Sequence, residues 1–108
     1  MKYNQALEEI SKQYTVNKIA LDSAQIITDV LLDEANIICI NITKEGEDVI
    51  LTDYAETINS FDLEEEQIKN ICDDYQMDFN DYAIETKYNS IDDLIRYIEC
   101  MKKIGTLL

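Results

Sequence analysis

The N-terminal third of the chain alternates between helical and extended patterns. Apolar side chains first recur at steps of four, three and four residues, at Tyr3, Leu7, Ile10 and Tyr14. This spacing predicts an amphipathic helix over residues 3–14. Residues 15–21 are rich in β-branched side chains and predict a short strand or an extended link. Residues 23–32 suit a helix face or a strand, and their β-branched content favours the strand.

A hairpin is the clearest pattern in the centre of the chain. In a strand over residues 37–43, Ile38, Ile40 and Ile42 point to one side and Cys39 and Asn41 to the other. Residues 44–47 supply a turn, because Gly46 readily takes a positive φ. Residues 48–52 then return as the second arm.

Two helices and a strand are predicted in the second half. Asp62 and Glu65 have the spacing of a capping box, and the stripe expected to be buried behind them is Ile68, Ile71, Cys72 and Tyr75. Residues 79–86 predict one strand, with Tyr82 and Ile84 facing the core.

The last helix has start and stop signals of its own. Ser90 and Asp93 repeat the capping pattern, and the helix is expected to end at Gly105 after Lys102 and Lys103. Its expected buried stripe is Ile91, Leu94, Ile95, Ile98 and Met101. The order of elements predicts an α+β fold, with an antiparallel meander of three to four strands and about three helices packed on one face. Residues 1–108 are expected to form a single domain.

One motif, Leu51–Ile58, is similar to a known family signature. It resembles the L-T-D-D-G-x-T-I sequence of a small-domain family of unknown function from low-GC bacteria and their phages, with Tyr54 and Ala55 at the Asp-Gly positions. The resemblance extends over residues 12–100. It implies the meander and a helix that starts after Asp53, and it supplies no activity. Independently of the family, structural capping of that helix is favoured over a site role for Asp53 and Thr57.

The formal net charge of −14 is unevenly distributed along the chain. Residues 1–44 hold six acidic residues and four lysines, and residues 82–108 hold four residues of each sign. Residues 45–81 hold thirteen acidic residues and Lys69 as the single base, a net charge of −12. Such a surface repels phosphate backbones and anionic membranes, so we expect no direct binding to nucleic acid or to a membrane.

The acidic segment has two interpretations. A solubilising, self-repelling face is the more frequent explanation of a charge run. The alternative is a docking face for a basic groove on another protein, since complementary potentials speed encounter and select partners. The residues that would form this face are Glu45, Glu47, Asp48, Asp53, Glu56, Glu64, Glu65, Glu66, Asp73, Asp74, Asp78 and Asp81.

The chain lacks the residue patterns of common enzymes. It has no histidine, no glycine-rich phosphate loop and no nucleophile motif, so we expect no catalysis and no cofactor. A divalent ion at Asp73, Asp74, Asp78 and Asp81 is disfavoured, because the spacing lacks the alternating pattern and glycine of a calcium loop. The three cysteines, Cys39, Cys72 and Cys100, have no metal-site spacing and are expected to be buried and reduced.

These observations lead to two hypotheses of function. In the first, the chain is an acidic protein-binding module, in the form of a phage-encoded inhibitor such as an anti-CRISPR or other DNA mimic. It would occupy the basic surface of a nuclease or CRISPR effector. In the second, it is a small regulatory or oligomeric interaction domain whose acidity is only solubilising, and a homodimer is left open. Because the N-terminus shows no signal-peptide pattern, we expect either form in the bacterial cytoplasm.

Overall fold

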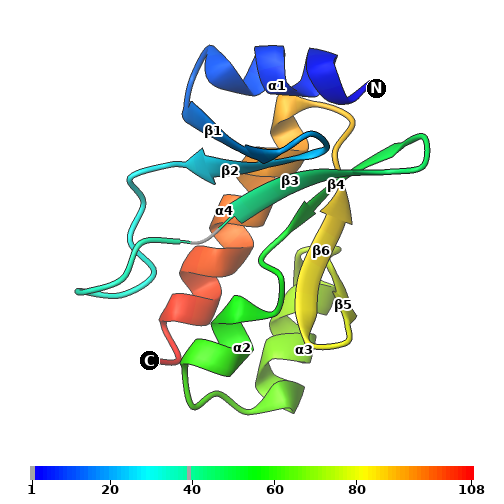
Figure 1. Ribbon diagram of the computed structural model, residues 1–108. Coiled ribbons are helices and arrows are strands. Elements are labelled where there is room, and N and C mark those ends of the chain that lie inside the picture. Colours follow the sequence, from blue (N-terminus) through cyan, green and yellow to red (C-terminus); the bar gives the residue numbers. More distant parts are fainter. Residues whose placement is uncertain (1, 39) are drawn as a thin grey trace.

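The computed structural model describes residues 2–38 and 40–108 and shows an α+β fold (Figure 1). Six strands form one antiparallel sheet, and four helices accompany it in this described part of the chain. The elements are α1 (Tyr3–Ser11), β1 (Thr15–Ala20), β2 (Ser23–Ile27), β3 (Ile40–Glu45), β4 (Asp48–Thr52), α2 (Glu56–Ser60), α3 (Glu65–Asp74), β5 (Asp78–Asn80), β6 (Ala83–Lys87) and α4 (Ile91–Gly105). The predicted fold class is confirmed, with more strands than the three to four expected.

The sheet is a meander that is extended by a second hairpin. Its strand order is β1-β2-β3-β4-β6-β5, so the first four strands are neighbours in sequence and in space. The chain then leaves the sheet through α2 and α3 and returns as the hairpin β5–β6. The second strand of this hairpin, β6, pairs with β4. The sheet therefore has β1 at one edge and β5 at the other.

The two faces of the sheet differ in chemistry. In Figure 1, α4 runs behind the sheet, and its Tyr97 hydroxyl donates a hydrogen bond of 2.6 Å to the Ile84 carbonyl of β6. On the core side, strand neighbours are aliphatic, as in the row Ala24, Ile42 and Leu51. The next row points to the opposite side and is polar on all six strands: Asn17, Gln25, Asn41, Thr52, Glu85 and Asp78. We call this set the polar row.

Several local predictions are confirmed. The helix near the N-terminus buries Tyr3, Leu7 and Ile10, although it ends at Ser11. Residues 23–27 form a strand, as their β-branched content favours, and Gly46 has a φ of 63° in the hairpin turn. The last helix starts at the predicted capping box, where the Asp93 carboxylate accepts a 3.1 Å hydrogen bond from the Ser90 N–H. Cys39 lies outside the described residues.

Three local predictions are wrong. Asp62 does not cap α3, which has Glu64 at its N-cap position and no side-chain hydrogen bond there. Residues 79–86 are two strands, because Asp81 and Tyr82 both take positive φ and form a tight turn that leaves Tyr82 51% exposed. Ile95 is 44% exposed, since the buried stripe of α4 runs through Leu94, Tyr97, Ile98, Cys100, Met101 and Ile104.

The turn between β4 and α2 has a strained backbone. Tyr54 and Ala55 have φ values of 52° and 61°, the left-handed region that non-glycine residues adopt at a cost. Asp and Gly tolerate that conformation better than Tyr and Ala do. The chain therefore makes this turn without a glycine.

We expect Ala55→Gly to stabilise the protein. Glycine removes the steric cost of positive φ, and the free energy of unfolding should rise by about 0.5–1 kcal/mol. Urea denaturation of both proteins measures the difference. Ala35→Gly is the control, because Ala35 is an exposed loop alanine that is absent from the positive-φ residues, whereas Ala55 is partly buried with a positive φ. An equal or larger gain from the control would contradict the assignment of strain to Ala55.

Candidate functional site

The structure divides the predicted acidic face into separate groups. The first group lies at the β3–β4 turn and consists of Glu45, Glu47 and Asp48, all exposed. Asp48 forms an ion pair with Lys87 across 3.5 Å, with both side chains more than half exposed. Such a surface pair contributes little to stability. This turn lies at the opposite end of the sheet from α2 and α3 (Figure 1), so it does not join the other carboxylates in one patch.

The largest group lies at the lower end of the molecule, where α3 packs beside β5 (Figure 1). We call residues 62–81 the acidic end. Its eight acidic side chains are all exposed: Asp62, Glu64, Glu65, Glu66, Asp73, Asp74, Asp78 and Asp81. Lys69 is the single base, so the acidic end has a net charge of −7, half of the total of −14. No ion pair within residues 2–38 and 40–108 involves any of these eight carboxylates.

The carboxylates of α3 differ in what they do for the helix. Glu65 and Glu66 stand in the first turn, where the helix dipole favours negative charge. Asp73 and Asp74 stand in the last turn, where the dipole disfavours it, and no basic residue accompanies them there. The first pair therefore has a structural explanation. The second pair is present at a cost in stability.

The prediction that Asp53 belongs to the exposed acidic face is wrong, because this side chain is 0% exposed. Its Oδ1 accepts hydrogen bonds from the N–H groups of Ala55 (3.0 Å) and Ile84 (2.9 Å). Its Oδ2 accepts one from the N–H of Thr57 at 3.2 Å. One carboxylate thus joins the end of β4, the first turn of α2 and strand β6. The capping role favoured for Asp53 is confirmed.

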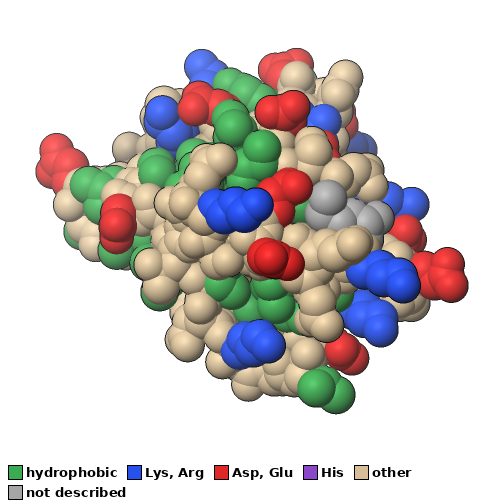
Figure 2. Space-filling view, turned by 90° about the horizontal axis from the view of Figure 1, so that it is seen from above, with side chains coloured by type: hydrophobic (Ala, Val, Ile, Leu, Met, Phe, Trp, Pro, Cys, Tyr) green, Lys and Arg blue, Asp and Glu red, His purple; other side chains and the backbone are tan. Residues whose placement is uncertain are grey.

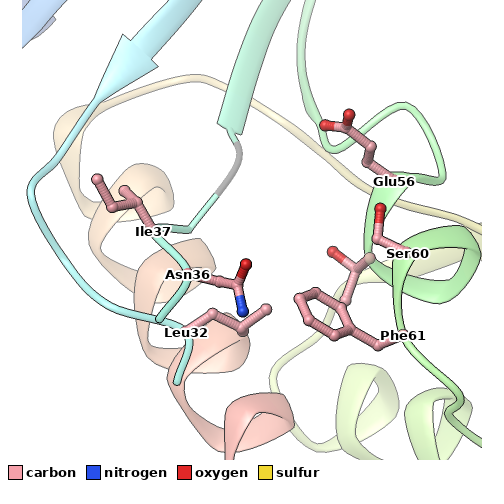
Figure 3. A pocket seen from close by; sticks show the side chains of 7 residues that line it. Leu32, Asn36, Ile37, Glu56, Ser60 and Phe61 are labelled. Carbon is pink, nitrogen blue, oxygen red and sulfur yellow. The ribbon is translucent and has the colours of Figure 1, made fainter. Parts of the chain in front are cut away.

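Glu56 lies apart from both groups, at a hollow of about 200 Å³ between α2 and the loop that precedes β3 (Figure 3). The hollow is lined by Leu32, Asn36, Ile37, Glu56, Thr57, Ser60 and Phe61. In the close view, the Leu32 and Asn36 side chains of the loop point toward Phe61 on the other side. Phe61 directly precedes Asp62, so the hollow borders the acidic end.

Glu85 is an acidic residue that the charge distribution along the sequence did not single out. It is half-buried in the polar row, between Thr52 of β4 and Asp78 of the acidic end. Burial raises the pKa of its carboxyl group, and the nearby carboxylates of Glu45 and Asp53 raise it further, against hydrogen bonds from Thr52 and Asn80 that lower it. Strand alternation could have found it, because Glu85 lies between Ile84 and Thr86 and so points away from the core.

The opposite end of the molecule has a different charge pattern. Figure 2 looks down on the side of α1 and shows basic and acidic side chains interspersed. A larger hollow of about 910 Å³ lies between the start of α1 and the turns β1–β2 and β3–β4. Its walls carry Lys2 and Lys44 together with Asp22 and Glu47, so its charges balance. This hollow therefore adds nothing to the excess of negative charge, half of which lies at the acidic end.

Two cysteines lie buried between α3 and α4. Cys72 and Cys100 are free thiols with no exposed surface, as expected for them from the sequence. The neighbouring Cys100 thiol and burial raise the pKa of Cys72 well above its usual range. Among the described residues, no three His, Cys, Asp or Glu side chains are grouped so as to hold a metal ion.

Comparisons with known proteins found no relative. The chain matches no protein-family model, no curated protein and no solved structure. Within the described part of the chain, no helix has the length and apolar character needed to cross a membrane.

Proposed function

We propose that this chain is a non-catalytic protein-binding module whose acidic end docks on a basic, nucleic-acid-binding surface of another protein. The observation that carries the proposal is the set of eight exposed carboxylates in residues 62–81, which include α3, the segment before it and the β5–β6 turn, and which no ion pair neutralises within the described residues. A patch that only solubilised the protein would have no reason to include Asp73 and Asp74 in the last turn of α3, where they destabilise the helix.

Carboxylates can replace phosphates as ligands of a basic groove. Arg and Lys side chains that bind a nucleic-acid backbone form equally strong charge-assisted hydrogen bonds with carboxylates. The ten residues of α3 form a rod about 15 Å long, since each residue rises 1.5 Å. Along this rod and the adjoining hairpin the acidic end presents negative charge with Lys69 as its single base, and its field would steer it toward a positive groove.

The form of this function that we propose is an inhibitor of a host defence nuclease, such as a CRISPR effector, encoded by a phage. The test is competition for the nucleic-acid channel. Fluorescence polarisation of a labelled DNA or guide-RNA duplex on each of a panel of nucleases would be followed as the chain is added. We expect displacement from at least one nuclease at low ionic strength. No displacement from any nucleic-acid-binding protein at about 50 mM salt would overturn the proposal.

The double variant Asp73→Asn, Asp74→Asn should raise stability and weaken binding at the same time. Removing both charges from the last turn of α3 should increase the free energy of unfolding by about 0.5–1.5 kcal/mol. If both side chains contact the partner, the affinity should fall about tenfold. Chemical denaturation and the displacement assay measure the two effects.

Two variants serve as controls for this pair. Glu65→Gln, Glu66→Gln removes the same charge from the first turn of α3 and should lower stability. Glu8→Gln, Asp22→Asn removes two exposed charges outside the acidic end and should leave binding unchanged. Binding that is indifferent to Asp73 and Asp74 would favour the alternative function.

That alternative is a small regulatory or oligomeric domain whose acidity is only solubilising. One observation favours it. Among the described strands, β1 pairs with β2 alone and is a sheet edge. Ile19 lies within β1 and Leu21 directly follows it, and both side chains are largely exposed. Edges of this kind can pair with a strand of another chain. In this case partner binding would depend on Ile19 and Leu21, and not on the carboxylates of α3.

A further inference from the structure

The loop before β3 forms an ordered projection, which we call the arm (residues 30–38). Backbone hydrogen bonds join Ile38 N–H to the Val30 carbonyl at 2.9 Å and Leu32 N–H to the Asn36 carbonyl at 2.7 Å. At its tip, the Asp33 Oδ1 accepts three hydrogen bonds of 2.8 Å, from the Ala35 N–H and from the N–H and Nδ2 of Asn36. The arm extends from the body of the molecule on the left of Figure 1.

The arm forms one wall of the hollow that Glu56 lines, and α2 with Phe61 forms the other (Figure 3). Its base is fixed against α4, where the Leu32 carbonyl lies in the space that a Cβ on Gly105 would occupy. The volume of about 200 Å³ is below the 300–1,000 Å³ of pockets that hold cofactors or drug-sized ligands. This volume suits a single long side chain.

The chemistry of the hollow selects a cation with an apolar stem. Leu32, Ile37 and Phe61 supply aliphatic and aromatic walls, and the seven lining residues include one acid and no base. Asp33 and Glu34 add two more carboxylates on the arm. Hydrogen bonds from the Ala35 N–H and the Asn36 side chain lower the pKa of Asp33, so this group stays charged.

The rim of the hollow is apolar. Leu31 and Ile37 are bridge partners on the two limbs of the arm and are 54% and 55% exposed. Exposed apolar residues around a polar anchor exclude water from it when a partner docks, which is the arrangement found around interface hot spots.

We propose that this hollow receives one arginine side chain of the partner protein. The stem of the arginine packs on Leu32 and Ile37, and its guanidinium group stacks on Phe61 and binds the Glu56 carboxylate. Asn36 also lines the hollow, and because its Nδ2 donates to Asp33, its Oδ1 is the atom that can accept a hydrogen bond from the guanidinium group. The inference rests on the proposed function and adds an anchoring contact beside the acidic end.

The test uses the isolated protein and a small probe, N-acetyl-arginine N′-methylamide. Titration followed by ¹⁵N–¹H NMR should shift the amide signals of the residues that line the hollow, with a dissociation constant on the order of 1–10 mM. The citrulline counterpart has nearly the same shape without the charge and should bind at least tenfold more weakly. The lysine counterpart should bind more weakly than arginine, because it lacks the planar group that stacks on Phe61.

Variants locate the site. Glu56→Gln should weaken arginine binding at least fivefold, whereas Glu47→Gln, at the distant β3–β4 turn, should not change it. Equal shifts of the amide signals with the arginine and citrulline probes, or shifts outside the hollow, would overturn the inference. The citrulline comparison uses the unmodified protein, so it does not depend on whether a variant folds. The outcome is separate from that of the displacement assay. Displacement of nucleic acid without arginine binding refutes the hollow alone, and arginine binding without displacement refutes the proposed partner class alone.

Discussion

Asp53→Ala is expected to lower the free energy of unfolding by about 3–5 kcal/mol, a large part of the stability of a domain of this size. The carboxylate accepts hydrogen bonds from Ala55, Thr57 and Ile84, and the side chain has no contact with solvent. Alanine would leave these N–H groups without their acceptor inside the protein, and each buried unsatisfied group costs about 1–3 kcal/mol. Because Ala55 and Thr57 lie at the start of α2 and Ile84 lies in β6, both of these elements should loosen.

Chemical denaturation measures this loss, and hydrogen exchange at Thr57 and Ile84 locates it. Asp53→Asn should lose less, since the remaining amide oxygen can still accept. Asp73→Ala is the control, because it also removes an acidic residue but from an exposed position in α3. A loss below about 1 kcal/mol for Asp53→Ala would mean that the carboxylate is not the acceptor that joins the three elements.

Gly105→Ala should destabilise the protein by about 2–3 kcal/mol, although alanine is normally the better residue in a helix. The new Cβ would collide with the backbone carbonyl of Leu32, which cannot rotate away as a side-chain end could. The arm would have to move, so the amide signals of Asn36 and Ile37 should shift in the same variant. The helical glycine is thus explained by the close approach of the arm.

The sign of this effect makes the test decisive. An exposed glycine within a helix gains about 1 kcal/mol on replacement by alanine, so a stabilised variant would contradict the contact between α4 and the arm. Gly46→Ala is a comparison in which the loss of stability has a different cause. Gly46 has open space around it and a φ of 63°, so its substitution should cost about 1 kcal/mol through backbone strain alone.

Local patterns predicted the elements well where one face of an element is buried. The hairpin around Gly46, the strand over residues 23–27 and the capping box at Ser90 depend on neighbours in sequence, and all three are confirmed. The turn at Asp81 and Tyr82 was missed because neither residue is a glycine, although both have positive φ. Because this turn was not predicted, residues 79–86 were expected to form one strand with Tyr82 facing the core.

The acidic face shows what one-dimensional patterns cannot provide. Residues 45–81 are contiguous in sequence, but β4 carries the chain from one end of the sheet to the other, and so separates Glu45 and Glu47 from Glu64 and Asp73. Asp53, at the end of that strand, became a buried acceptor. Glu85 was also missed, because residues 82–108 have no net charge. Strand pairing places it beside Asp78. Half of the net charge is nevertheless gathered at one end, as the docking hypothesis requires.

The central claim is that the carboxylates of the acidic end make the contacts with a basic partner, and the salt dependence of binding tests it most directly. The affinity for the nuclease found by displacement should be measured between about 50 and 300 mM salt. We predict a steep linear fall of log K with log salt, a smaller slope for Asp73→Asn, Asp74→Asn, and an unchanged slope for Glu8→Gln, Asp22→Asn. A flat dependence, or the same slope in all three proteins, would contradict the account.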